Sequence, residues 1–279
     1  MINLIKCELY RFFKSKYFLI LAIIGLAFSI IVPLLEFALK TTISNTAEMY
    51  GATAQFSFSA MDRMQGALNP SALFGFLIPI FILVLLTQDY RNGTIRIKIT
   101  SGVSKLKIMA SNYIVSFIFM LVLMLGYGLF SFLFSLIFFP VVPEEVTLVG
   151  KYVGYFFLTL LYDIIQYAFI VSLVILLVTL IRTPGLCAFV LVIATFGLQF
   201  VGTMLGYIVS YLETYETNME SLITFVSVFN WINPFYLAGT LTISEYSNAL
   251  LVSNIVTPIA FLILNAGLGY LAFIKKDIK

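Results

Sequence analysis

The sequence contains few side chains that could carry out chemistry. It has no His and only two Cys, Cys7 and Cys187, so a His-ligated metal site is excluded and two thiols alone make a poor one. The lack of His also argues against a Ser-His hydrolase. No G-x-x-x-x-G-K-S/T run is present, because Gly150-Lys151 lacks the preceding Gly. We therefore expect no catalytic residue, no metal site and no cofactor on this chain.

Asp163 is the one acidic residue that lies well inside an apolar run. A carboxyl group within a membrane is costly to bury, so it is a functional candidate, here as the proton or ion site of a secondary transporter. The other interpretation is a carboxyl that hydrogen-bonds to polar neighbours such as Gln166 or Gln199. We favour this structural role, and the sequence leaves both interpretations open.

The composition is that of an integral membrane protein. Of the 279 residues, 61% are hydrophobic and 10% are charged, whereas soluble domains average about 25% charged residues. No soluble fold hides so much apolar surface. The chain therefore reads as a single all-α transmembrane domain, residues 1–279, with membrane lipid around it. The formal net charge of +3 is unremarkable, and no nucleic-acid partner is expected.

Long apolar runs predict six transmembrane helices. The first run, residues 17–39, is long enough to cross a hydrocarbon core of about 30 Å at about 1.5 Å per residue, and the second is short. The expected spans are at about residues 17–39, 71–87, 108–139, 151–181, 186–211 and 254–274.

Residues 1–16 predict an amphipathic helix that lies on the membrane surface. At about 100° per residue its apolar side chains fall within one arc, whereas Lys6, Arg11 and Lys14 fall outside it and can meet lipid head groups. The alternative is a basic flank of the first span. The apolar arc consists of Ile2, Ile5, Leu9, Phe12 and Phe13.

The basic residues are distributed unevenly across the expected spans. With six spans, all but three of the 16 Lys and Arg residues fall on the side of the two termini, the exceptions being Lys40, Arg63 and Lys151. Positive residues are retained in the cytoplasm. We therefore expect a multi-pass membrane protein with both termini, and the segment 88–107, in the cytoplasm.

The segment 88–107 is the most elaborate of these cytoplasmic connections. Ile95, Ile97 and Ile99 alternate with polar residues, which is the period of a strand, and a solvated basic loop is a further interpretation. Its five basic residues are Arg91, Arg96, Lys98, Lys105 and Lys107.

The run Asp89-Tyr90-Arg91-Asn92-Gly93-Thr94, followed by Gly102, Ser104 and Lys105, resembles the first cytoplasmic loop of type-2 ATP-binding-cassette (ABC-2) permeases. Asp89 stands where that family usually has Glu, and Lys105 where it usually has Arg, which makes fork-type contacts that Lys cannot. The resemblance extends to the amino-terminal helix, the six spans and the broken stretch before the last span. It implies a coupling helix, formed by the residues just named, that sits in a groove of a cytoplasmic ABC ATPase subunit.

Small residues recur one turn apart in two spans, at Gly25 and Ser29 in the first and at Gly202, Gly206 and Ser210 in the fifth. Such spacing lets helices approach closely in lipid. Packing within the chain explains it equally well. The resemblance favours contact with a second permease protomer and a place along the translocation path.

Residues 212–253 are too polar to span a membrane and too apolar for an ordinary loop. They suit two short helices that dip into the outer leaflet, with a turn at Asn233-Pro234. Asn230 and Trp231 lie just before this turn. We expect these four residues to form an outer anchor at the head-group level, or else an outer gate.

Taken together, these features and the resemblance imply the membrane subunit of a bacterial type-2 ABC exporter. Its partners would be an ABC ATPase subunit that carries the ATP and Mg²⁺, and a second permease protomer, identical or a sibling. The cargo would be amphipathic or hydrophobic: an antimicrobial or surface-active peptide, a drug or a lipid. The alternatives are an ATP-independent secondary transporter or channel that uses Asp163, and a non-transporting scaffold or immunity protein.

Overall fold

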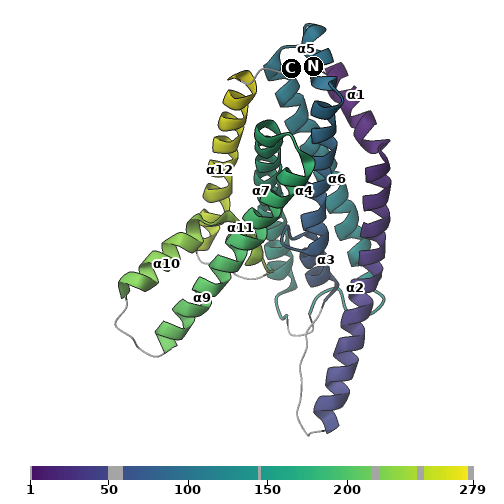
Figure 1. Ribbon diagram of the computed structural model, residues 1–279. Helices are drawn as coiled ribbons and strands as arrows, with labels where there is room; N and C mark the ends of the chain where they lie inside the picture. Colours follow the sequence, from purple (N-terminus) through teal and green to yellow (C-terminus); the bar gives the residue numbers. More distant parts are fainter. Residues whose placement is uncertain (1, 50–58, 144–145, 215–219, 244–247, 276–279) are drawn as a thin grey trace.

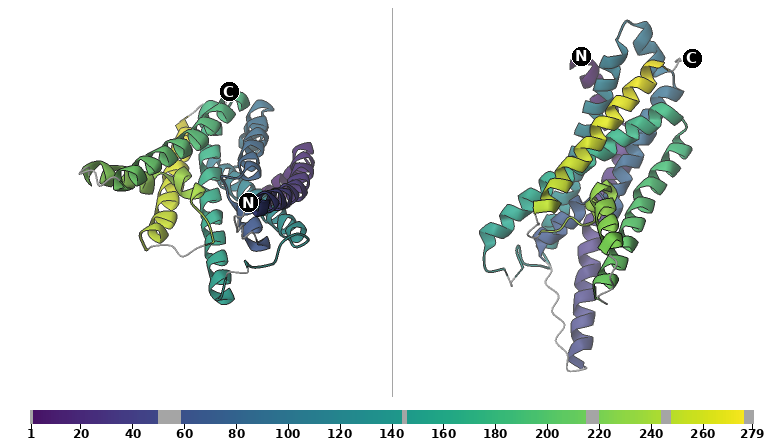
Figure 2. Two further views of the ribbon diagram at one scale, coloured as in Figure 1. Left: turned by 90° about the horizontal axis from the view of Figure 1, so that it is seen from below. Right: turned by 90° about the vertical axis from the view of Figure 1, so that its left-hand side faces the viewer.

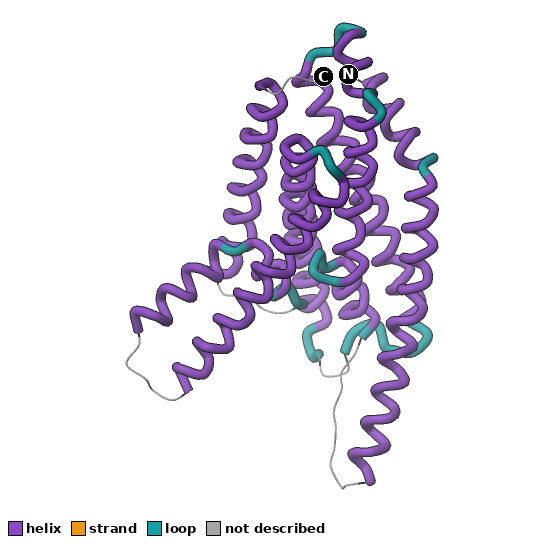
Figure 3. Tube along the Cα trace, viewed as in Figure 1, coloured by secondary structure: helices purple, strands orange, loops and turns teal. Residues whose placement is uncertain are grey.

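The computed structural model describes residues 2–49, 59–143, 146–214, 220–243 and 248–275. Within these residues the fold is all helical, and the remaining described residues form turns and loops (Figure 3). The helices are α1 (Ile2–Phe13), α2 (Lys16–Met49), α3 (Ala60–Leu68), α4 (Leu73–Arg91), α5 (Thr94–Thr100), α6 (Lys105–Ser135), α7 (Val149–Ile181), α8 (Pro184–Val192), the π-helix η1 (Ile193–Gly197), α9 (Leu198–Thr214), α10 (Glu220–Ile232), α11 (Pro234–Gly239) and α12 (Asn248–Lys275).

Six helical segments of the described chain are long and apolar enough to cross a membrane, which confirms the predicted number. They are Lys16–Ile43, Ala60–Arg91, Lys105–Ser135, Val149–Ile181, Pro184–Leu212 and Val252–Lys275.

Several helix boundaries differ from the predicted ones. The first spanning helix does not end near residue 39 but continues to Met49, and the second continues past residue 87 to Arg91. The third begins at Lys105 and ends at Ser135, earlier than predicted at both ends. Backbone hydrogen bonding explains the extensions to Met49 and Arg91 and the early start at Lys105, because a helix continues through polar residues until a cap or turn stops it.

The segment 88–107 is not a loop, and the strand period read from Ile95, Ile97 and Ile99 is wrong. The segment consists of the last turn of α4, the short helix α5 and the start of α6. Gly93 (φ 68°) and Gly102 (φ 84°) take left-handed backbone conformations at the two ends of α5. Ile95 and Ile99 are four residues apart and share one face of the helix, whereas Ile97 is exposed. An alternation of only five positions therefore fits a helix as well as a strand.

The core of the bundle is built around α7 and α6. Helix α7 packs against α12, α4, α6 and α8, and α6 packs against α3, α2 and α1 (Figure 1). Large side chains without solvent exposure, such as Phe119 and Ile78, fill the space between these helices. Helices α9 and α10 project from the bundle on the side away from α2 (Figures 1 and 2).

The described part of α1 lies at the same end of the bundle as α5 and the end of α12 (Figure 1). Most of the apolar arc of α1 packs against the chain itself: Phe12 is buried, and Ile5, Leu9 and Phe13 are partly buried. Phe12 and Phe13 pack their rings against Phe119 of α6, with 5.3 Å between the ring centroids of Phe12 and Phe119. Ile2 is the exposed member of the arc.

Candidate functional site

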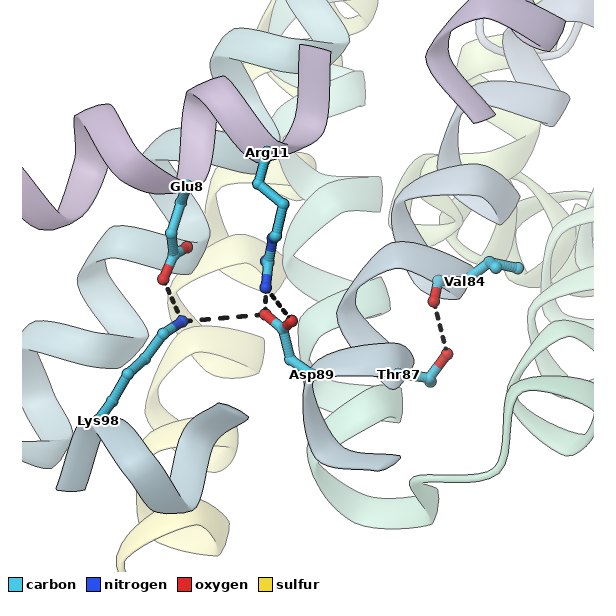
Figure 4. Close-up of polar contacts among 6 residues, drawn as sticks. All are labelled: Glu8, Arg11, Val84, Thr87, Asp89 and Lys98. Carbon is cyan, nitrogen blue, oxygen red and sulfur yellow. Dashed lines mark hydrogen bonds and ion pairs between the residues drawn. The ribbon is translucent and has the colours of Figure 1, made fainter. Parts of the chain in front are cut away.

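Four charged side chains from three helices meet where α1, α4 and α5 come together (Figure 4). Arg11 donates hydrogen bonds to both oxygens of Asp89, with 2.7 Å between Nη2 and Oδ2. Lys98 of α5 donates to Oε1 of Glu8 and lies 3.9 Å from Oδ2 of Asp89. We call Glu8, Arg11, Asp89 and Lys98 the charge cluster. Its charges alternate in sign and sum to zero.

Burial makes the charge cluster a strong link between helices. Asp89 and Glu8 are each only 3% exposed, so each carboxylate depends on its cationic partner for solvation. Burial disfavours the charge on Arg11, but the hydrogen bonds and negative charge of Asp89 outweigh it and raise the pKa of Arg11. A bidentate guanidinium–carboxylate pair also fixes orientation. The charge cluster therefore fastens α1 to the end of α4 and to α5.

Helix α5 is also held by its backbone and by one apolar anchor. Gly93 and Gly102 turn the chain at its two ends. Ile95 is buried in the main hydrophobic core, and Ile99 packs against that core from the same helix face. A seven-residue helix is marginal on its own. These contacts supply the stability that its length does not.

The run that resembles ABC-2 permeases is thus divided between buried and exposed positions. Asp89 is buried in the charge cluster, and Tyr90 lies under Arg182, whose guanidinium carbon is 5.5 Å from the ring centroid. Arg91 and Asn92 are exposed, and Thr94 begins α5.

The residues after α5 form the second half of that run. Gly102 is exposed, and Ser104 takes the N-cap position of α6 without a side-chain hydrogen bond to it. Lys105 donates to the carbonyl oxygen of Ile274 at 3.0 Å, which places a positive charge at the end of α12. The structure therefore links this segment to the last spanning helix as well.

An exposed surface remains on the outside of α5 and the first turn of α6. Ile97 is 66% exposed and Leu106 is 55% exposed, and Arg91, Arg96 and Lys107, which lie near them in the sequence, are exposed too. We call these five residues the docking face. Exposed apolar side chains at the end of a helical bundle are candidates for contact with another protein or with the membrane surface.

The polar side of α9 borders an open groove of about 330 Å³. Gly202 lies against α11, because a Cβ added there would be 2.8 Å from the Cβ of Tyr236. Ser210 is exposed and donates to the carbonyl oxygen of Gly206 at 3.2 Å. The groove is lined by Gln199, Thr203, Gly206, Tyr207, Ser210, Tyr236, Gly239 and Thr240.

The small residues of the first spanning helix face the chain's own interior. A Cβ on Gly25 would be 2.7 Å from the ring of Phe74 on α4. Ser29 is buried and donates to the carbonyl oxygen of Leu26 at 2.8 Å. Their small size therefore serves packing between α2 and its neighbours in this chain.

Two Asn side chains attach α10 and α11 to α9. Asn230 donates to the carbonyl oxygen of Gly202 at 3.2 Å, and Asn233 donates to that of Leu198 at 2.7 Å. Asn233 also accepts bonds from two amides of α11, in which Pro234 is the first residue. Trp231 is exposed, and its carbonyl oxygen accepts a bond from Thr257.

An apolar pocket of about 370 Å³ lies beside this attachment, between α7, α9, α10, α11 and α12. Its walls are mainly aromatic and aliphatic, with Asn233 and Asn265 as polar members. Aromatic members include Phe169, Phe229, Phe235 and Phe261.

Asp163 is fully buried, and its partner is not the one that the sequence led us to expect. Gln65 of α3 donates to Oδ2 of Asp163 at 2.6 Å. Neither amide atom of Gln166 has a hydrogen-bond partner among the described residues. The side chain of Gln199 lies close to Gly239 instead. Helix α3 brings Gln65 to this position.

Comparison of the chain with protein-family models found no match, and comparison with curated proteins found none either.

Proposed function

We propose that this chain is the membrane-spanning permease subunit of an ATP-driven ABC exporter, with ATP hydrolysed on a separate subunit. The observation that carries the proposal is the docking face on α5. Ile97 and Leu106 are largely exposed, and the exposed basic residues near them in the sequence suit an acidic rim on a partner. In this proposal the partner is a cytoplasmic ABC ATPase, as the loop resemblance implies.

The distribution of charge supports the orientation that this function needs. Lys40, Arg63 and Lys151 belong to the opposite side of the chain from α5, and the other Lys and Arg residues lie on the side of the termini. By the positive-inside rule, α5 and both termini are cytoplasmic in a bacterial cell membrane. The docking face is then within reach of a cytoplasmic ATPase.

The charge cluster supplies a route by which a push on α5 reaches the spans. Lys98 on α5 contacts both Glu8 and Asp89, so α1 and α4 follow a displacement of α5. Helix α1 in turn packs on α6. In this proposal α5 is the coupling helix and α1 is an interfacial helix that moves with it.

A second permease protomer would cover the polar side of α9. The groove beside Thr203, Tyr207 and Ser210 faces outward from a spanning segment, where exposure of polar groups to lipid is unfavourable. A polar groove on one side of α9 and an apolar pocket on another suit an amphipathic cargo. In this arrangement α10 and α11 dip into the outer leaflet as an anchor or gate.

The alternative of an ion site at Asp163 has less support. Asp163 is bound to Gln65 and has no solvent exposure, as expected for a carboxyl that holds α3 against α7. Purification in mild detergent from a bacterial host that encodes this chain distinguishes an ABC permease subunit from a secondary transporter. We expect an ATPase with a Walker motif to co-purify in equal amount. A chain that transports without such a subunit would contradict the proposal.

A further inference from the structure

A large open cavity lies between α1, the start of α2 and the end of α4. Its volume is about 870 Å³. One face of α1 forms one wall, and the first residues of α2 form another. The cavity shares no residue with the docking face. Its lining residues include Tyr10, Lys14, Lys16, Tyr17 and Ile20.

The net positive charge of the side chains that line this cavity favours the binding of an anion. Three cationic side chains, Arg11, Lys14 and Lys16, line the cavity together with one carboxylate, Asp89, and Arg11 already neutralises that carboxylate. Among the described residues no carboxylate pairs with Lys14 or Lys16. Two positive charges are therefore left unbalanced at one site.

The cavity also has an apolar side that continues into the lipid-facing surface. Ile20 and Leu85 line it, and beyond Ile20 the helix α2 exposes Ile23 and further aliphatic side chains. The apolar spanning segment begins at Lys16, so Lys14 and Lys16 lie where a lipid head group would be. Tyr10 and Tyr17 have the amphipathic character typical of that depth.

We propose that this cavity binds one anionic phospholipid. The phosphate lies beside Lys14 and Lys16, and the acyl chains run along Ile20 and the exposed face of α2. Tyr17 accepts a hydrogen bond from Gln88 Nε2 at 2.8 Å, so its own hydroxyl hydrogen is available to a phosphate oxygen. Free phosphate shares the head-group chemistry but would leave the apolar side unused. The site depends on membrane insertion and not on the ATPase.

Native mass spectrometry of the full chain in detergent, titrated with single lipids, tests this site. We expect phosphatidylglycerol to bind about tenfold more tightly than phosphatidylcholine, since each basic residue near an anionic lipid contributes severalfold. The variant Lys14→Gln/Lys16→Gln should lose this preference. The matched control Lys6→Gln/Lys151→Gln removes the same charge outside the cavity and should keep it.

Three results would overturn the proposal. They are equal binding of the two lipids by the unaltered chain, an unchanged preference in Lys14→Gln/Lys16→Gln, and displacement of phosphatidylglycerol by an equal concentration of inorganic phosphate. Lys14 and Lys16 are exposed, so their replacement should not disturb folding. The single variant Lys14→Gln, with an expected preference of about threefold, gives a second measurement. If the lipid site is disproved, the ATPase should still co-purify, because the two proposals use different residues.

Discussion

Arg11 of α1 donates hydrogen bonds to both carboxylate oxygens of Asp89, 78 residues further along the chain at the end of α4. The pair spans the gap between the amino-terminal helix and the second spanning segment. With Lys98 and Glu8 it connects three helices at the end of the bundle that carries α5. The proposed coupling depends on this connection.

Breaking the Arg11–Asp89 pair should destabilise the chain. Arg11→Ala and Asp89→Ala should each lower the melting temperature in detergent by roughly 5 °C, because each leaves a charge without its partner. A double-mutant cycle should give a coupling free energy of about 1–3 kcal/mol. Arg91→Ala, at an exposed position two residues on, should leave the melting temperature unchanged. Additive losses in the cycle would show that the pair contributes nothing.

The docking face should matter for assembly and not for folding. Ile97→Ser should reduce recovery of the ATPase subunit by about tenfold or more, because it removes the large exposed apolar side chain of α5 from the proposed interface. Its melting temperature should not change. Leu148→Ser is the matched control, since Leu148 is 62% exposed and precedes α7, at the opposite end of that helix from Arg182. Equal recovery of the ATPase from both variants would show that the docking face does not bind the ATPase.

Replacement of Asp163 separates a structural role from an ion site. Asp163→Asn keeps an oxygen that can accept the hydrogen bond from Gln65, so folding and transport should both be retained. Asp163→Leu should lower the melting temperature by several degrees, because it leaves the buried Nε2 of Gln65 without a partner. Transport assays on both variants check this. Loss of transport in a stably folded Asp163→Asn would favour the secondary transporter.

Alanine should have different effects at two helical glycines, because Gly202 of α9 lies against α11 and Gly154 of α7 lies in open space. Gly202→Ala should destabilise the chain, since the new Cβ would be 2.8 Å from the Cβ of Tyr236. Gly154→Ala should be neutral or stabilising by up to about 1 kcal/mol, because nothing lies within 4 Å of that position and Ala favours a helix. Thermal unfolding of both variants in detergent measures the difference. The same shift for both would contradict close packing at Gly202.

Composition and hydrophobic pattern predicted the coarse fold. The number of spans follows from the apolar runs, because membrane thickness leaves little choice of length. Helix ends were predicted less well. The alternation of isoleucines from Ile95 to Ile99 has the period of a strand, yet the left-handed glycines at positions 93 and 102 enclose a helix. Over so few residues hydrophobic pattern does not decide between the two.

The long-range pairs could not be predicted from the sequence. Glu8 and Arg11 looked like part of an amphipathic surface helix, and nothing local indicates that they meet Lys98 and Asp89. A pattern analysis places a residue on a helix face but does not say which helix covers that face. One signal was present: Glu8 lies beside the apolar arc of its helix, and a carboxylate near a buried face needs a cationic partner.

Photo-crosslinking from α5 in the native membrane tests the central claim most directly. With a photoreactive residue in place of Ile97, we predict a covalent product that contains this chain and a Walker-motif ATPase, and no such product from position 148. Absence of an ATPase product from position 97, or labelling of that position by a reagent confined to the cell exterior, would contradict the account.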